Sequence, residues 1–517
     1  MSAFARRAPA LSFRWFAAHE ARLMWRDWTA LMRGGSLRKR AVTWTIVLLA
    51  VFGLHLFADY VVAKASLFGI RPDEGTLLLV MAGLSMMVSL MFSQAIEAVT
   101  RAYYGRSDLE LVLSSPASAE RLFLVRTGVV AGQTMLLALM ISAPMVNMLA
   151  YHEGAAWLST YVVLASLGAM ATAFAIGIAL GLLRLVGPTR TRLISQIIAA
   201  VVGAAFVIAL QALAIMSGNG FSRTDFLTSA ETVARVPEAS SAWWAVAKAA
   251  MTGEGLLPLV GLALAALGIA AIVSARSFAV HVLSTAGLPE TTATEKTFRG
   301  FDRRTDVRSA LRAKEWRLLF RDPWLLSQSL QQILYLLPPA LLLYMKYGDD
   351  RSILFVIVPV VIMAVGQLSG GLAWLAISGE DAHELITTAP VSRRDVLIAK
   401  MQAVGTIAVL VLMPFAIAMA FFSGEAALWT IFGGGAAAAS AVVIQLWFRA
   451  QAKRSFFRRR QVSSRAATIC EAMVAINWAA IACLAMVGTD LHRLSLPVVA
   501  LVVTFLVAWA IKPAREA

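Results

Sequence analysis

The segment EARLMWRD at residues 20–27 recurs as EWRLLFRD at residues 315–322. A second pair follows in the same order, ELVLSSPAS at residues 110–118 and ELITTAPVS at residues 384–392. The first pair is offset by 295 positions (315 − 20) and the second by 274 (384 − 110). Two landmarks that recur in one order at nearly one period indicate two copies of one unit. A unit of this length is typical of one half of a duplicated membrane transport protein.

The composition indicates a membrane protein. Hydrophobic residues make up 59% of the 517 residues and charged residues 15%, and the mean hydropathy is +0.73. A soluble domain of this length does not bury so much apolar surface. The formal net charge of +16 is typical of nucleic-acid binding in a soluble protein, but in a polytopic protein basic residues belong to cytoplasmic loops. We therefore expect the lipid bilayer as a partner and no nucleic acid.

Twelve apolar stretches are long enough to cross a bilayer, which takes about 20 helical residues. They are residues 41–62, 76–98, 123–149, 157–183, 193–216, 256–275, 328–345, 352–377, 398–422, 426–447, 466–487 and 494–511. The weakest is 328–345, which is short and contains Pro338 and Pro339. The expected fold is an all-α polytopic membrane protein with about twelve transmembrane helices, arranged as two pseudo-repeated six-helix halves, each preceded by an amphipathic interfacial helix.

Basic residues predict the orientation. With the N-terminus in the cytoplasm, 38 of the 46 Lys and Arg residues fall on the cytoplasmic side, including Arg126 and Lys400 at the ends of their spans. Such an excess marks the cytoplasmic side of a membrane protein. Both termini are therefore expected in the cytoplasm. The first half is expected over residues 1–285 and the second over 308–517, with a cytoplasmic linker at 286–307.

An amphipathic helix is expected before each half, at residues 13–31 and 308–324. In the first, Phe13 lies on the apolar face, while Arg22 and Arg26 lie opposite. Each helix is interpreted either as an anchor in the plane of the lipid headgroups or as an element that contacts a cytosolic partner. The repeated Arg-Asp pair favours the partner, because an aspartate is unfavourable against an anionic lipid surface.

Two Glu…Pro segments, residues 107–122 and 380–397, join the second and third spans of each half. Proline ends one short helix, and Ser118 or Ser392 is expected to cap the next. In the second copy Asp395 follows its cap by three residues, as in a capping box. Each segment is interpreted either as a simple connector or as a rigid element that docks into another protein.

These motifs together resemble the permease subunit of an ABC-2-type exporter, and the tandem arrangement is similar to ABC exporter membrane proteins with both halves in one chain. The resemblance implies that the amphipathic element is the connecting helix and the Glu…Pro element the ATPase-coupling helix. The implied coupling residues are Glu110, Leu111, Pro116, Glu384, Leu385 and Pro390. The implied connecting-helix residues are Glu20, Arg22, Arg26, Asp27, Glu315, Arg317, Arg321 and Asp322. The halves differ after Asp27 and Asp322, where Trp28 corresponds to Pro323.

No G-x-x-x-x-G-K-[ST] phosphate-binding loop occurs in the sequence, so the chain is not expected to be an enzyme itself. The resemblance implies a separate ATP-binding subunit, in two copies, that holds ATP and Mg²⁺. It also implies a bacterial cytoplasmic membrane and the export of a substrate that the sequence does not identify. No cofactor and no metal site are expected in this chain.

A secondary active transporter, or a membrane-embedded assembly factor without an ATPase partner, remains the alternative. Few ionisable residues lie within the predicted spans, which disfavours a proton relay. Glu97 and Arg126 are expected to snorkel at span ends, and Glu471 lies about one turn inside its span. His55 and Asp59 lie toward the outer end of the first span. Each of these is interpreted as a boundary residue with a partner or water.

The long segment 217–255, expected on the outer side, corresponds to a stretch of only six residues in the second half, 488–493. Its Trp243 and Trp244 favour an interfacial anchor over a lid above a translocation path. Residues 245–250 are expected to extend it as a surface helix.

Overall fold

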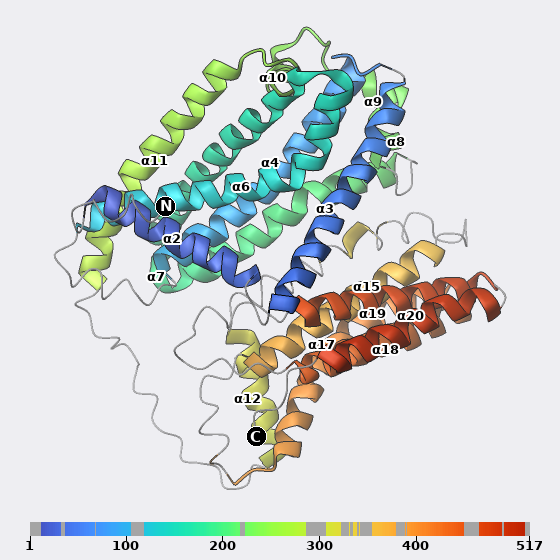
Figure 1. Ribbon diagram of the computed structural model, residues 1–517. Coiled ribbons are helices and arrows are strands. Elements are labelled where there is room, and N and C mark those ends of the chain that lie inside the picture. Colours follow the sequence, from blue (N-terminus) through green and yellow to red (C-terminus); the bar gives the residue numbers. More distant parts are fainter. Residues whose placement is uncertain are drawn as a thin grey trace. The chain divides into compact units, whose positions relative to one another are not determined.

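The computed structural model describes residues 12–32, 37–67, 69–104, 118–217, 223–285, 307–321, 330, 334, 336–338, 341, 354–378, 388, 390–448, 465–488 and 491–511. Within these ranges all regular structure is helical, which confirms the predicted all-α fold (Figure 1). The chain divides into two compact units, Met1–Leu210 with Ser222–Thr294, and Gln211–Phe221 with Glu295–Ala517. The domain boundaries inferred from the repeat stay a prediction.

The first unit is built around α6. Its helices are α2 (Phe13–Met32), α3 (Leu37–Ser66), α4 (Glu74–Tyr104), α6 (Ala119–Glu153), η1 (Ala155–Leu158), most of α7 (Ser159–Met216), α8 (Arg223–Thr228), α9 (Ala230–Val233), η2 (Ala242–Trp244), α10 (Ala245–Thr252) and α11 (Leu256–Thr285). Helix α6 packs against α2, α3, α4 and α11 (Figure 1). Buried Ile96, Phe123, Val130 and Ile176 fill the space between α4, α6 and α7.

A break at Gly187 divides α7 into two pieces. Gly187 has φ of 76°, a left-handed value that glycine adopts without a Cβ clash. Pro188 follows directly, and its ring fixes φ at a value suited to starting a helix. The two pieces correspond to the fourth and fifth predicted spans, and each is long and apolar enough to cross a membrane by itself.

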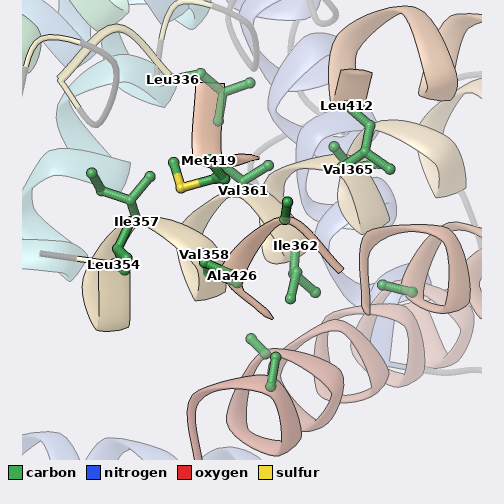
Figure 2. Packing of buried hydrophobic residues seen from close by; sticks show 14 of the residues in the cluster. Leu336, Leu354, Ile357, Val358, Val361, Ile362, Val365, Leu412, Met419 and Ala426 are labelled. Atoms are coloured by element: carbon green, nitrogen blue, oxygen red, sulfur yellow. The ribbon is translucent and has the colours of Figure 1, made fainter. Parts of the chain in front are cut away.

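The second unit is built around α15. Its helices are α12 (Val307–Arg321), α15 (Leu354–Ser378), α17 (Arg393–Ala420), α18 (Gly424–Trp447), α19 (Arg465–Met486) and α20 (Leu491–Ile511). Helix α15 packs against α17, α18 and α19. Figure 2 shows Ile357, Val361 and Ile362 of α15 grouped with Met419 and Ala426. All five are buried, so α15 is enclosed by neighbouring helices over much of its length.

The helices agree with the predicted spans wherever the structure describes them. Nine segments of the described ranges are long and apolar enough to cross a membrane. Helices α3 and α20 cover two further predicted spans. Of the predicted span 328–345, the structure describes residues 330, 334, 336–338 and 341.

The segment between α7 and α11 packs on its own unit more closely than predicted. Trp244 is 1% exposed, and its indole Nε1 donates to the carbonyl oxygens of Pro237 at 3.1 Å and Glu238 at 3.2 Å. A buried tryptophan satisfied in this way is a core residue rather than an interfacial anchor, so the prediction for Trp244 was wrong. Trp243 is 68% exposed. Helix α10 buries Ala247 and Ala250, so the predicted surface helix exists but is half enclosed.

Candidate functional site: two buried ion-pair clusters

The inward face of entry helix α2 carries a glutamate. Phe16 and Glu20, one turn apart, are buried, and Phe16 packs against Leu122 and Val125 of α6. Phe13, which the predicted apolar face contains, is 52% exposed. Helix α2 therefore directs Phe16 and Glu20, which the predicted apolar face did not contain, toward α6.

That partner is Arg126 of α6. Its Nε lies 3.7 Å from Glu20 Oε1, with side-chain exposures of 2% and 6%. Its Nη1 donates to the backbone carbonyl oxygen of Ala102, in the last turn of α4, at 3.2 Å. Carbonyls there lack a helical partner, and a cation near them is favourable. The first cluster, Glu20, Arg126 and the Ala102 carbonyl, thus joins α2, α4 and α6, and Arg126 does not snorkel as predicted.

The second unit repeats this arrangement with a lysine. Lys400 Nζ of α17 lies 3.0 Å from Glu315 Oε1 of α12 and donates to Oε2 at 3.2 Å. It also donates to the carbonyl oxygen of Ala376, in the last turn of α15. Glu315 is fully buried, and Lys314 Nζ contributes a second cation 3.2 Å from its Oε1. The second cluster, Glu315, Lys400 and the Ala376 carbonyl, thus joins α12, α15 and α17.

The two clusters occupy equivalent places in the repeat. Arg126 and Lys400 are 274 positions apart (400 − 126), and so are Ala102 and Ala376 (376 − 102). This is the offset of the two Glu…Pro motifs. The glutamates are offset by 295 positions, which is the offset of the two entry helices. The same contacts made twice, at the offsets of the sequence repeat, support two copies of one structural unit.

Buried ion pairs of this kind hold a specific geometry rather than adding much net stability. Removing two charges from water costs several kcal/mol, which their attraction and hydrogen bonds offset only when the geometry is good. Removing one partner leaves an uncompensated charge and costs about 3–5 kcal/mol. Each cluster therefore fixes the position of an entry helix on the two helices that flank a Glu…Pro segment.

A further ion pair joins α12 to α17 beside the second cluster. Ser392 caps α17 by accepting from the Asp395 N–H at 3.0 Å, and its hydroxyl donates to Asp395 Oδ2 at 2.7 Å. Arg308 Nε of α12 donates to Asp395 Oδ1 at 3.0 Å. Both predicted serine caps are confirmed, since Ser118 accepts from the Arg121 N–H at 3.3 Å. The first half has Arg121 where the second has Asp395.

Most residues assigned by the resemblance are only partly described. Glu20 and Glu315 lie buried in the two clusters, whereas Arg22, Arg317 and Pro390 are exposed. Helical positions whose side chains lie outside the description are Arg26, Asp27 and Arg321. Residues outside the described ranges are Glu110, Leu111, Pro116, Asp322, Glu384 and Leu385. Their coupling and connecting roles stay predictions.

The structure adds Arg126 and Lys400, which the sequence indicated only as positive charges at span ends. A signal was present, because both follow a capping serine by eight positions (126 − 118 and 400 − 392). The described residues contain no group of three or more His, Cys, Asp or Glu that could hold a metal ion.

Polar groups also meet at the far end of the first unit, between α3, α6 and α7. His152 Nε2 lies 2.7 Å from Asp59 Oδ1, and His55 Nε2 lies 3.3 Å from Asn147 Nδ2. The hydroxyl of Tyr161 donates to Asn147 Oδ1 at 2.7 Å. His55 and Asp59 therefore have partners, as interpreted from the sequence.

Comparison with known proteins identifies a family. A family model described as "membrane protein of 12 TMs" matches residues 37–511. No curated protein matches the chain, and no solved structure does. The match covers both units, and the twelve spans of the family agree with the predicted count. The chain therefore belongs to this family of polytopic membrane proteins with twelve transmembrane helices.

Proposed function

We propose that this protein is the permease subunit of an ATP-driven ABC exporter, in which a separate ATP-binding subunit supplies the energy. Two copies of that subunit would bind one chain and hold the ATP and Mg²⁺. Both termini and both Glu…Pro segments would face the cytoplasm of a bacterium. The substrate remains unidentified.

The observation that carries the proposal is the position of the two clusters. Residues 105–118 connect α4 to α6, and Arg126 of α6 is hydrogen-bonded to the Ala102 carbonyl of α4. Residues 379–392 connect α15 to α17, where Lys400 makes the same contact with Ala376. In both units the helices that enter and leave the segment are thus joined close to it, and the entry helix is joined to them.

This arrangement suits the transmission of force. A push on Glu110, Leu111 and Pro116 would reach α4, α6 and α2 together, because the first cluster resists their separation. A push on Glu384, Leu385 and Pro390 would likewise reach α15, α17 and α12. Two such points match two ATPase copies, whose closure would move the two units against each other.

The proposal is tested by purifying the tagged chain from its native membrane and assaying ATP hydrolysis. We expect an ATP-binding protein at about two copies per chain, and we expect the paired variant Glu110→Arg with Glu384→Arg to lose it. The matched control is Glu231→Arg, at a site 73% exposed on the segment expected to face outward, which should retain it. A chain that transports without any ATP-hydrolysing partner would contradict the proposal and favour a secondary transporter.

A further inference from the structure

A carboxyl group lies inside the second unit, apart from the two clusters. Glu471 of α19 is 7% exposed, and the amide Nε2 of Gln445 of α18 donates to its Oε1 at 2.6 Å. Among the described residues, this is the one hydrogen bond to the Glu471 side chain. Glu471 lies within a segment apolar and long enough to cross the membrane, Ala467–Met486.

The carboxyl group fills a space that a glycine leaves open. A Cβ added to Gly370 of α15 would lie 1.7 Å from Glu471 Oε2 and 2.7 Å from its Cδ, so a larger residue there would displace this side chain. One turn away, a Cβ on Gly366 would lie 3.0 Å from the Ala475 side chain. Helices α15 and α19 therefore approach closely, with the carboxyl group packed between them.

The helices around Glu471 offer little to neutralise a negative charge. Helix α15 contains no ionisable residue, and α18 contains only Glu425, twenty positions before Gln445 (445 − 425). On α17, Lys400 is held by Glu315, while Arg393, Arg394 and Asp395 lie in the first turn. The remaining ionisable groups on the packed helices are Arg465, Cys470 and Cys483 of α19, and His492 and Arg493 of α20.

From this geometry we infer that Glu471 is a proton-binding site. Its side chain is the protonated, neutral carboxylic acid when α15, α18 and α19 are packed as described. A buried carboxylate with a single amide donor is far more costly than a neutral, hydrogen-bonded acid of the same size. Loss of the proton would require water or a cation to enter between α15 and α19 beside the carboxyl group. The inference does not depend on the proposed ATPase partner.

Proton loss would act on one half of the protein. Gly370 and Ala376 are six residues apart on α15, about 9 Å along the helix axis, so the proton-binding site and the second cluster share a helix. The corresponding span of the first half, residues 193–216, contains no carboxylate. We therefore expect pH to alter the packing of α15 in the second unit.

Unfolding of the purified protein in lipid–detergent micelles across pH tests the inference, with wild type compared to Glu471→Gln, which mimics the neutral acid. The stability that the proton provides is present at low pH and lost as pH rises, so wild type should fall relative to Glu471→Gln between about pH 5 and about pH 9. The matched control Glu425→Gln, at the exposed start of α18, should parallel wild type. Parallel profiles for wild type and Glu471→Gln would overturn the inference.

A hydrophobic carbodiimide locates the proton. Such reagents add a protonated carboxylic acid across a C=N bond, and the adduct rearranges to a stable N-acylurea without a leaving group. Peptide mass spectrometry should find the adduct at Glu471, at least about tenfold more at the lower pH than at the higher. An adduct yield at Glu471 that does not fall as pH rises would overturn the pH-dependent part of the inference.

Discussion

Arg126 and Lys400 make the same contacts in the two units: each binds a buried glutamate of an entry helix and the third-from-last carbonyl of the helix before a Glu…Pro segment. One is an arginine and the other a lysine, so the shared feature is a cation at this position. The side chain differs between the two units, but its contacts are the same. We infer that the role of this position is to join three helices.

Loss of the cation in the second cluster should be costly. Lys400→Met leaves Glu315 buried with Lys314 as its remaining described cation, so we expect a loss of about 3–5 kcal/mol in the free energy of unfolding. Lys400→Arg should lose much less, because Arg126 fills the equivalent position. Denaturant unfolding in mixed micelles measures both. Equal losses for the two variants would show that side-chain volume, not charge, matters here.

Surface ion pairs provide the comparison. Arg308 is 67% exposed in its pair with Asp395, so Arg308→Ala should cost about 1 kcal/mol or less. The same measurement applies, and raised salt should reduce this small difference further because exposed pairs are screened. A loss as large as that of Lys400→Met would contradict the distinction between buried and exposed pairs.

Replacing both charges of the second cluster distinguishes its effect on the free energy of unfolding from its effect on transport. In Glu315→Leu with Lys400→Met no charge is left unpaired at the cluster's centre, so the free energy of unfolding should recover most of the loss of Lys400→Met. In the proposed exporter, ATP hydrolysis by the partner subunit should continue while transport falls, because the entry helix is no longer bound to α17 and α15 by directed contacts. Full transport in this variant would show that the second cluster only stabilises the fold.

The two serine caps, Ser118 and Ser392, should contribute unequally to the stability of the protein. Ser118→Ala removes one bond to the Arg121 N–H and should cost about 1 kcal/mol. Ser392→Ala should cost more, because it also removes the hydroxyl bond to Asp395, which is itself paired with Arg308. Thermal unfolding of the two variants side by side gives the order. A larger effect at Ser118 would contradict the network described for the second half.

Two glycines of α18, Gly433 and Gly435, differ in how closely neighbouring side chains pack against them. A Cβ on Gly433 would lie 2.5 Å from Ile362 Cδ1, whereas one on Gly435 meets nothing within 4 Å. Gly433→Ala should therefore destabilise by about 1–3 kcal/mol through overpacking. Gly435→Ala should be neutral or stabilising by about 0.5–1 kcal/mol, since alanine is the better helix former. Reversed signs would contradict the packing of α15 on α18.

The helices were predictable because hydropathy alone indicates where a chain crosses a membrane. The inward face of α2 was not, because a helical wheel treats glutamate as a solvent-facing residue, whereas Glu20 faces inward with Arg126. Trp244 was misassigned for a related reason. Its sequence context could not reveal that the Pro237 and Glu238 carbonyls satisfy its indole inside the unit.

The two Glu…Pro segments were identified from the sequence repeat alone. What the structure contributes is their boundary: Ala102 with Arg126 before and after the first, and Ala376 with Lys400 before and after the second. The constant offset of 274 could have indicated these residues, but only the three-dimensional contact explains why a cation stands at each.

The most direct test of the account is the membrane side on which the two Glu…Pro segments lie. In a variant lacking both native cysteines, Cys470→Ala with Cys483→Ala, a single cysteine is placed as Glu110→Cys or Glu384→Cys and labelled in sealed vesicles of known orientation with a membrane-impermeant maleimide. We predict that both positions are labelled from the cytoplasmic face alone. Labelling of the two positions from opposite faces would contradict a duplicated permease driven at two equivalent points.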